Sequence, residues 1–149
     1  MLMRVLTICA LAAAVGLPTI AAETKVNIKA LPPAVQTAMR EQIKGATILG
    51  ASKEREHGHL TYEVETKLDG KGRDLTFDQN GSLLEIEQEV ELNSIPGPAK
   101  EAIQKRVAGG TVKKVESVTQ GSSTSYEADV TTRTGKKQEV AVNADGSAH

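Results

Sequence analysis

The chain of 149 residues contains the same pattern twice, and this repeat constrains its fold more than any other feature. An offset of 64 places Leu31-Pro32 over Ile95-Pro96. The other matched segments are Tyr62–Glu65 with Tyr126–Asp129 and, after one inserted residue, Leu75–Asp78 with Val140–Asn143 and Gly81 with Gly146. A match sustained over most of each half indicates a duplication, so both halves should adopt the same fold.

Each half opens with the pattern of an amphipathic helix. In the first half Pro32-Pro33 precedes an apolar stripe and Gly45 follows it, which is typical of a helix start and stop. In the second half we expect Ser94 to cap the helix and Pro96 or Pro98 to open it. The two stripes, at three- and four-residue spacing, are Val35, Ala38, Met39, Ile43 and Ala99, Ala102, Ile103, Val107.

Apolar residues then recur at every second position, which is typical of half-buried strands separated by turns such as Asn80-Gly81. The expected strands are 47–54, 61–68, 74–78 and 84–92 in the first half and 112–119, 126–132 and 139–143 in the second. Residues 147–149 are too few for a fourth strand. We predict an α+β fold of two tandem units, each an N-terminal helix packed on an antiparallel three- to four-stranded meander sheet.

Residues 1–22 have the features of a secretory signal peptide. Arg4 is followed by an apolar stretch of about 11 residues, which is too short to span a bilayer. We expect cleavage after Ala22, with Ala21 as the alternative, and therefore a periplasmic or secreted protein with no stable membrane insertion. The remaining segments are an N-terminal linker (23–29), a first unit (30–92) and a second unit (93–149) with a truncated last strand.

The composition excludes several classes of function. Cys9 is the only cysteine and lies in the expected signal peptide, so the processed chain has no disulfide and no thiolate. The chain has 18 Lys+Arg against 19 Asp+Glu, without the basic excess typical of nucleic-acid-binding proteins. No segment has the pattern of an activated nucleophile on a strained turn. We expect no enzymatic activity, no cofactor and no nucleic-acid partner.

An acidic row is the strongest candidate for a binding surface. The candidate residues are Glu63, Glu65, Glu85, Glu87, Glu89 and Glu91, which alternate with apolar residues and should share the open face of the sheet. On an open face these carboxylates should stay hydrated and ionised. The favoured interpretation is that they keep the chain soluble and protect the sheet from edge pairing. The alternative interpretation is that these carboxylates bind a cationic partner or bind Ca²⁺ weakly.

Two smaller features of the sequence are a histidine pair and an uneven distribution of charge. His57 and His59 flank Gly58 at a predicted hairpin, where they could share a metal, although two exposed turn histidines are the favoured interpretation. Residues 23–91 carry 9 Lys+Arg and 13 Asp+Glu, whereas residues 92–149 carry 8 and 6, so the second unit is mildly basic. Its pairs Lys113-Lys114 and Lys136-Lys137 are each too small to predict a binding site.

The complete pattern resembles the PepSY-like family, and its tandem copies resemble the β-lactamase-inhibitor-like proteins. The resemblance is carried by Leu31, Pro32, Tyr62, Glu63, Val64, Phe77, Asp78 and Gly81 and by Ile95, Pro96, Tyr126, Glu127, Val142, Asn143 and Gly146. It implies a cell-envelope or secreted domain that binds or inhibits another protein, such as a peptidase. It supplies no catalytic residue.

We therefore expect an exported, non-enzymatic protein that binds another envelope or secreted protein. The alternative is a periplasmic buffer or sensor of divalent metals that uses the acidic sheet face together with His57 and His59. A hydrolase is the least favoured class, because no nucleophile and base are arranged together in the sequence.

Overall fold

The computed structural model describes residues 23–43, 45–56 and 58–149. The elements follow in the order β1 (Thr24–Lys25), η1 (Ile28–Ala30), α1 (Pro33–Gln42), β2 (Thr47–Glu56), β3 (His59–Leu68), β4 (Lys71–Asp78), β5 (Leu83–Val90), η2 (Leu92–Ser94), α2 (Gly97–Val107), β6 (Thr111–Gln120), β7 (Ser123–Thr131) and β8 (Lys137–Asn143). An antiparallel sheet and two α-helices confirm the predicted α+β class. The predicted signal peptide and His57 lie outside the described residues.

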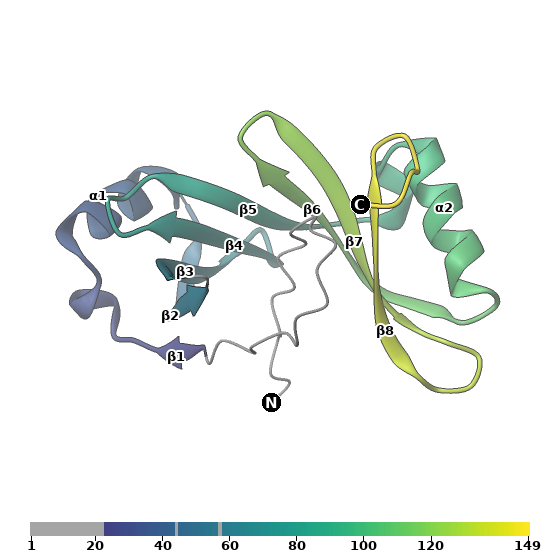
Figure 1. Ribbon diagram of the computed structural model, residues 1–149, viewed down its shortest axis with the longest axis horizontal. Helices are drawn as coiled ribbons and strands as arrows, with labels where there is room; N and C mark the ends of the chain where they lie inside the picture. The colour runs from purple at the N-terminus through teal and green to yellow at the C-terminus, as the bar shows by residue number, and fades with distance from the viewer. Residues whose placement is uncertain (1–22, 44, 57) are drawn as a thin grey trace.

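All eight strands belong to one sheet, in which they follow one another in sequence order (Figure 1). We expected a separate three- to four-stranded sheet in each unit, and this expectation was wrong. Strand β5 pairs with β6 in an antiparallel register that places Val90 opposite Val115. The pairing satisfies backbone groups that two separate sheets would leave at their edges.

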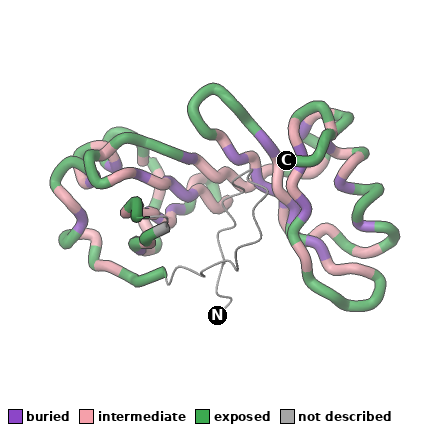
Figure 2. Tube along the Cα trace, viewed as in Figure 1, coloured by how far each residue is buried: buried purple, intermediate pink, exposed green. Residues whose placement is uncertain are grey.

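The predicted apolar stripes are the residues that the helices bury. Helix α1 buries Val35 and Met39, which belong to a core cluster with the strand residues Val64, Leu75 and Phe77. The matching cluster contains Ala99, Ile103 and Val107 of α2 together with Val115, Ala128, Val130, Val140 and Val142. Figure 2 shows these buried stretches along both helices and along the strands of both halves. Since side chains alternate along a strand, both helices lie on the same face of the sheet.

The helix starts differ in one respect from the expectation. Helix α1 begins at Pro33 and α2 at Gly97, each after a proline at the N-cap position that provides no side-chain cap. The expectation that Ser94 caps α2 was wrong. Ser94 lies in η2, where its hydroxyl donates to the carbonyl of Glu91 at 2.8 Å. Proline at the first turn fixes φ near the helical value without needing a capped N–H there.

Both ends of the sheet extend beyond the predicted strands. Residues 24–25, within the expected linker, form β1 by pairing with Lys53 and Ser52 of β2. At the other end Ala148 makes an isolated bridge to Val142, at the position that corresponds to the pairing of Leu83 with Phe77. Within the described residues, no helix is both long and apolar enough to cross a membrane.

In each unit a glycine turn packs closely against the first turn of the helix. Gly81 has φ +84°, and a Cβ built there would lie 2.7 Å from the carbonyl oxygen of Ala34 in the first turn of α1. Gly146 has the same φ, and a Cβ there would lie 2.6 Å from the carbonyl oxygen of Pro98 in α2. Only a residue without Cβ allows this approach, so the repeat conserves a packing contact as well as a turn.

We predict that Gly81→Ala and Gly146→Ala each destabilise the protein by about 2–4 kcal/mol, since left-handed backbone strain adds to overpacking against the helix. The matched control is Gly70→Ala, because Gly70 has φ +82° with nothing within 4 Å of a built Cβ. It should cost only about 1–2 kcal/mol from backbone strain. Urea unfolding measures the difference, and equal losses at Gly70 and Gly81 would contradict the packing argument.

Candidate functional site

The face of the sheet turned away from the helices carries a continuous group of carboxylates, here called the acidic face. Its acidic residues are Glu63, Glu65, Asp74, Glu85, Glu87, Glu89, Glu116, Glu127, Asp129 and Glu139, on strands β3 to β8. The strand register places Glu65 opposite Asp74 and Asp74 opposite Glu87. Across the junction of the two units Glu89 lies opposite Glu116, which lies opposite Glu127.

The residues of the predicted acidic row differ in their burial and in their hydrogen-bond partners. Glu85 is only 7% exposed, so the expectation of a fully open and hydrated row was wrong at this position. Its carboxylate accepts a hydrogen bond from the side-chain amide of Gln120 on β6. Glu89 is half-buried and accepts from the backbone N–H of Gly72 at 3.1 Å.

Glu91 lies beyond the end of β5, and its side chain is exposed. The ammonium group of Lys71 is 2.7 Å from its carboxylate. The hydrogen bond and the positive charge of Lys71 lower the pKa of Glu91. Glu91 therefore stays ionised and paired at the border of the acidic face.

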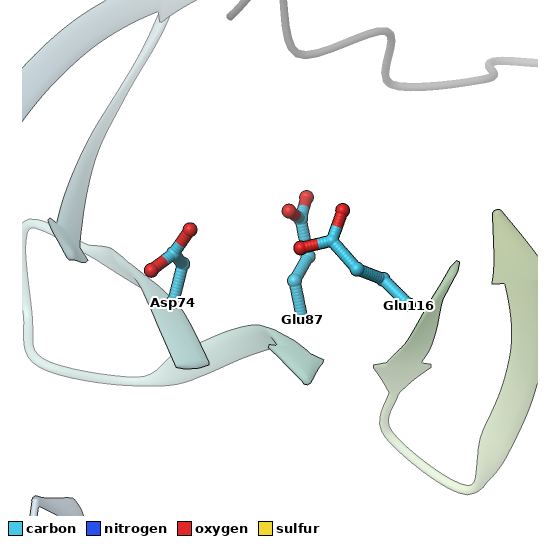
Figure 3. A group of neighbouring side chains, drawn as sticks. All are labelled: Asp74, Glu87 and Glu116. Atoms are coloured by element: carbon cyan, nitrogen blue, oxygen red, sulfur yellow. The ribbon is translucent and has the colours of Figure 1, made fainter. Parts of the chain in front are cut away.

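Three carboxylates converge at the centre of this face (Figure 3). One oxygen from each of Asp74, Glu87 and Glu116 lies within 4.8 Å of the other two. Asp74 and Glu116 are buried, Glu87 is half-buried, and all three take part in further polar interactions. The backbone N–H of Thr66 donates to Asp74 at 3.3 Å. Chemically, such an oxygen-only group can attract the side chain of a lysine or arginine, or a hard divalent cation.

Glu127 on β7 adds a carboxyl group whose charge is disfavoured. Burial, followed by the negative charges of Glu139, Glu85, Glu116 and Asp129, raises the pKa of Glu127 from 4.5 to about 7. Lys114 is ion-paired in this part of the face, with its ammonium group 2.7 Å from Glu116 and 3.7 Å from Asp129. At neutral pH Glu127 is therefore poised between its neutral and its charged form.

The histidine pair does not extend this group of carboxylates within the described residues. His59 is the first residue of β3, on the same strand as Glu65. Six residues of extended strand separate the two, a distance of about 20 Å. A ligand bound at His59 would therefore lie far from Asp74 and Glu87.

Sequence reasoning missed Asp74 of the first unit and the residues that the second unit contributes. Glu127 corresponds to Glu63 under the repeat offset, so its place on the face could have been predicted. Glu116 corresponds to Ser52, and its approach to Glu87 depends on the pairing of β5 with β6, which the repeat does not specify.

We predict that Glu127→Gln removes a pH dependence from folding stability. Because the pKa of Glu127 is higher in the folded protein, its stabilising contribution is complete below about pH 4.5 and is lost as the pH rises through about 7. The variant should be more stable than the parent by about 1–2 kcal/mol at about pH 8 and nearly unchanged at about pH 5, allowing for solvent screening at this half-buried group.

Thermal unfolding across this pH range measures the effect. Glu101→Gln is the control, because Glu101 is an exposed glutamate on α2 outside the acidic face. A stability gain at high pH that is the same for both variants would mean that only net charge matters.

The comparisons with known proteins agree with the fold. The family described as "Putative beta-lactamase-inhibitor-like, PepSY-like" matches residues 19–85 and 61–147. No curated protein sequence matches the chain.

Three solved structures from Bacteroides show the same fold. A protein of B. eggerthii DSM 20697, described as "putative periplasmic", superposes with a TM-score of 0.64 at 16% identity, covering 78% of this chain and 84% of its own. A DUF2874 family protein of B. ovatus ATCC 8483 superposes with a TM-score of 0.62 at 17% identity, covering 78% of this chain and 84% of its own. A BLIP-like protein of B. fragilis NCTC 9343 superposes with a TM-score of 0.59 at 23% identity, covering 79% of this chain and 83% of its own.

The two overlapping matches together span most of the sequence, including both helices and all the strands of the sheet. The chain belongs to the PepSY-like, β-lactamase-inhibitor-like family.

Proposed function

We propose that this protein is an exported, non-enzymatic binding protein whose acidic face binds a Lys- or Arg-rich segment of another envelope or secreted protein, such as a peptidase. The observation that carries the proposal is the convergence of Asp74, Glu87 and Glu116 within 4.8 Å at the centre of this face. The family description, which refers to inhibitors of another protein, supports a binding role. A neighbour described as periplasmic supports export.

The surroundings of these carboxylates favour an organic cation. Carboxylates that are already partly buried interact with a cation more strongly than exposed ones, because less water screens the charges. Glu89 and Glu116 are directly opposite each other on neighbouring strands, and like charges so placed destabilise a sheet. A lysine or arginine side chain from a partner would relieve this repulsion by placing a positive charge beside both carboxylates.

The width of the face also suits a protein partner. Carboxylates occur on six neighbouring strands, which lie about 4.8 Å apart, so the face spans more than 20 Å. An extended segment with several cations could reach more than one group of carboxylates. Complementary charge of this kind favours fast association and selects against acidic partners.

We predict that neutralising the accessible part of the face weakens binding. The variant Glu63→Gln/Glu87→Gln/Glu89→Gln keeps the size of each half-buried side chain and removes three charges. A partner captured from envelope extract, then purified, should bind the parent saturably and bind this variant at least about tenfold more weakly, with an affinity that falls as salt is added.

The matched control removes three acidic charges elsewhere: Glu23→Gln, Glu41→Gln and Glu101→Gln, all at exposed positions outside the face. Calorimetric titration should give the parent affinity for this control. If the face variant binds as tightly as the control, the acidic face is not the docking surface. Thermal unfolding of each variant separates lost binding from lost folding.

The divalent-metal alternative remains a prediction and is tested on the same protein. For the proposed protein-binding role we expect calorimetric titration with Ca²⁺, Zn²⁺ and Cu²⁺ to show no saturable binding tighter than about millimolar. A tighter saturable heat that disappears in Asp74→Asn and Glu116→Gln would favour metal binding by the face. Loss of this heat in His59→Ala would instead place the metal at the hairpin.

A further inference from the structure

The second unit has a strongly basic end that the sequence did not predict. Its six cationic residues, here called the basic end, are Lys105, Arg106, Lys113, Arg133, Lys136 and Lys137. They come from the last turn of α2, the start of β6, the turn between β7 and β8, and the first residue of β8. In Figure 1 the turn that follows α2 and the yellow β7–β8 turn lie at the same end of the molecule.

Backbone packing brings these segments together. Gly110, after α2, lies so close to β7 that a Cβ built there would be 2.2 Å from the carbonyl oxygen of Thr131. Thr131 is paired with Thr111 on one side and with Lys137 on the other. The guanidinium of Arg106 donates to the carbonyl of Ala141 on β8 at 2.8 Å. The lysine pairs that seemed separate in the sequence therefore belong to one surface.

The acidic residues near these cations along the chain include Glu101, four residues before Lys105, and Glu139, two residues after Lys137. All six side chains are exposed, and the segments 105–113 and 131–138 contain no acidic residue. Among the described residues, no ion pair involves any of the six. The cations repel one another, and an anionic partner would remove that repulsion.

The first unit provides an internal comparison. Its positions corresponding to the basic end are Glu41, Gln42, Leu49, Asp69, Lys71 and Gly72, which include one cation and two acids. Lys71 is moreover paired with Glu91. The six-cation surface is thus a property of the second unit and is not required by the fold.

The kind of partner follows from what surrounds the cations. Among the described residues, the large apolar side chains that are exposed are Leu49, Leu83 and Leu84, all in the first unit. Near the basic end Val107 is buried in the core and Val112 is half-buried, so the described surface there has no exposed apolar centre of the kind that stable protein interfaces bury. Six exposed cations from several elements instead suit a dense array of anionic groups that can adjust their positions.

We propose that the basic end binds a membrane surface of anionic phospholipid headgroups. The six exposed cations would face the lipid phosphates, with each cation near the surface adding about a fivefold increase in affinity. The first unit lies at the opposite end of the molecule (Figure 1), so binding at the basic end leaves that unit away from the lipid. This role is separate from partner binding by the acidic face.

The test is vesicle flotation with the processed protein recovered after export. We expect binding to phosphatidylcholine vesicles in which about a third of the lipid is phosphatidylglycerol, no binding to pure phosphatidylcholine, and release at high salt. The variant Arg133→Gln/Lys136→Gln/Lys137→Gln should bind on the order of a hundredfold more weakly. The control Lys25→Gln/Lys29→Gln/Lys53→Gln removes three exposed cations, two from residues 23–29 and one from the first unit, and should retain binding.

Three results would overturn the proposal. One is failure of the parent protein to bind anionic vesicles. Another is equal loss in both triple variants, which would show that net charge alone is responsible. The third is self-association without lipid that disappears in the basic-end variant, since the partner would then be the acidic face of a second copy. Sedimentation measures that association, and unchanged thermal unfolding of the variants excludes misfolding.

Discussion

The pairing of β5 with β6 is the interaction on which the rest of the structure depends. It joins the last strand of the first unit to the first strand of the second, with Val90 opposite Val115 and the hydroxyl of Ser117 donating to the carbonyl of Gln88 at 3.4 Å. Two short sheets with open edges become one sheet with a continuous surface on each side. One surface receives both helices, and the other stays uncovered by secondary structure within the described residues.

The same pairing assembles the central carboxylates, because neither unit contains all three. Asp74 and Glu87 come from the first unit and Glu116 from the second, and the register of β5 with β6 brings them together. Like charges on neighbouring strands oppose this pairing. The apolar contacts on the helix side, the ion pair of Lys114 with Glu116 and the raised pKa of Glu127 all reduce that repulsion. The acidic face and the junction between the units are therefore energetically coupled.

Most of the fold within a unit was predictable, because burial imposes periodicity on the sequence. The helix stripes and the main strands follow from that periodicity, and Gly81 and Gly146 mark turns that the structure also uses for packing. Strand β1 was missed because two residues carry no periodicity. The position of Glu116 beside Glu87 was missed because pairing between the units is not part of the repeated pattern. The basic end was missed for a related reason, since it forms from turns that only the folded chain brings together.

Comparison of the two copies shows which residue positions the fold constrains and which positions can vary. Core positions keep an apolar character while changing in size, as where Phe77 corresponds to Val142. Outward positions change charge, as where Ser52 corresponds to Glu116 and Asp69 to Arg133. Each exchange of this second kind adds to a charged surface without altering a core contact. One sheet can therefore carry an acidic face across both units and a basic end on only one, where Lys137 and Glu139 mark the border between them on β8. The pattern that identifies the family therefore reflects the core, whereas these outward residues differ between the two copies.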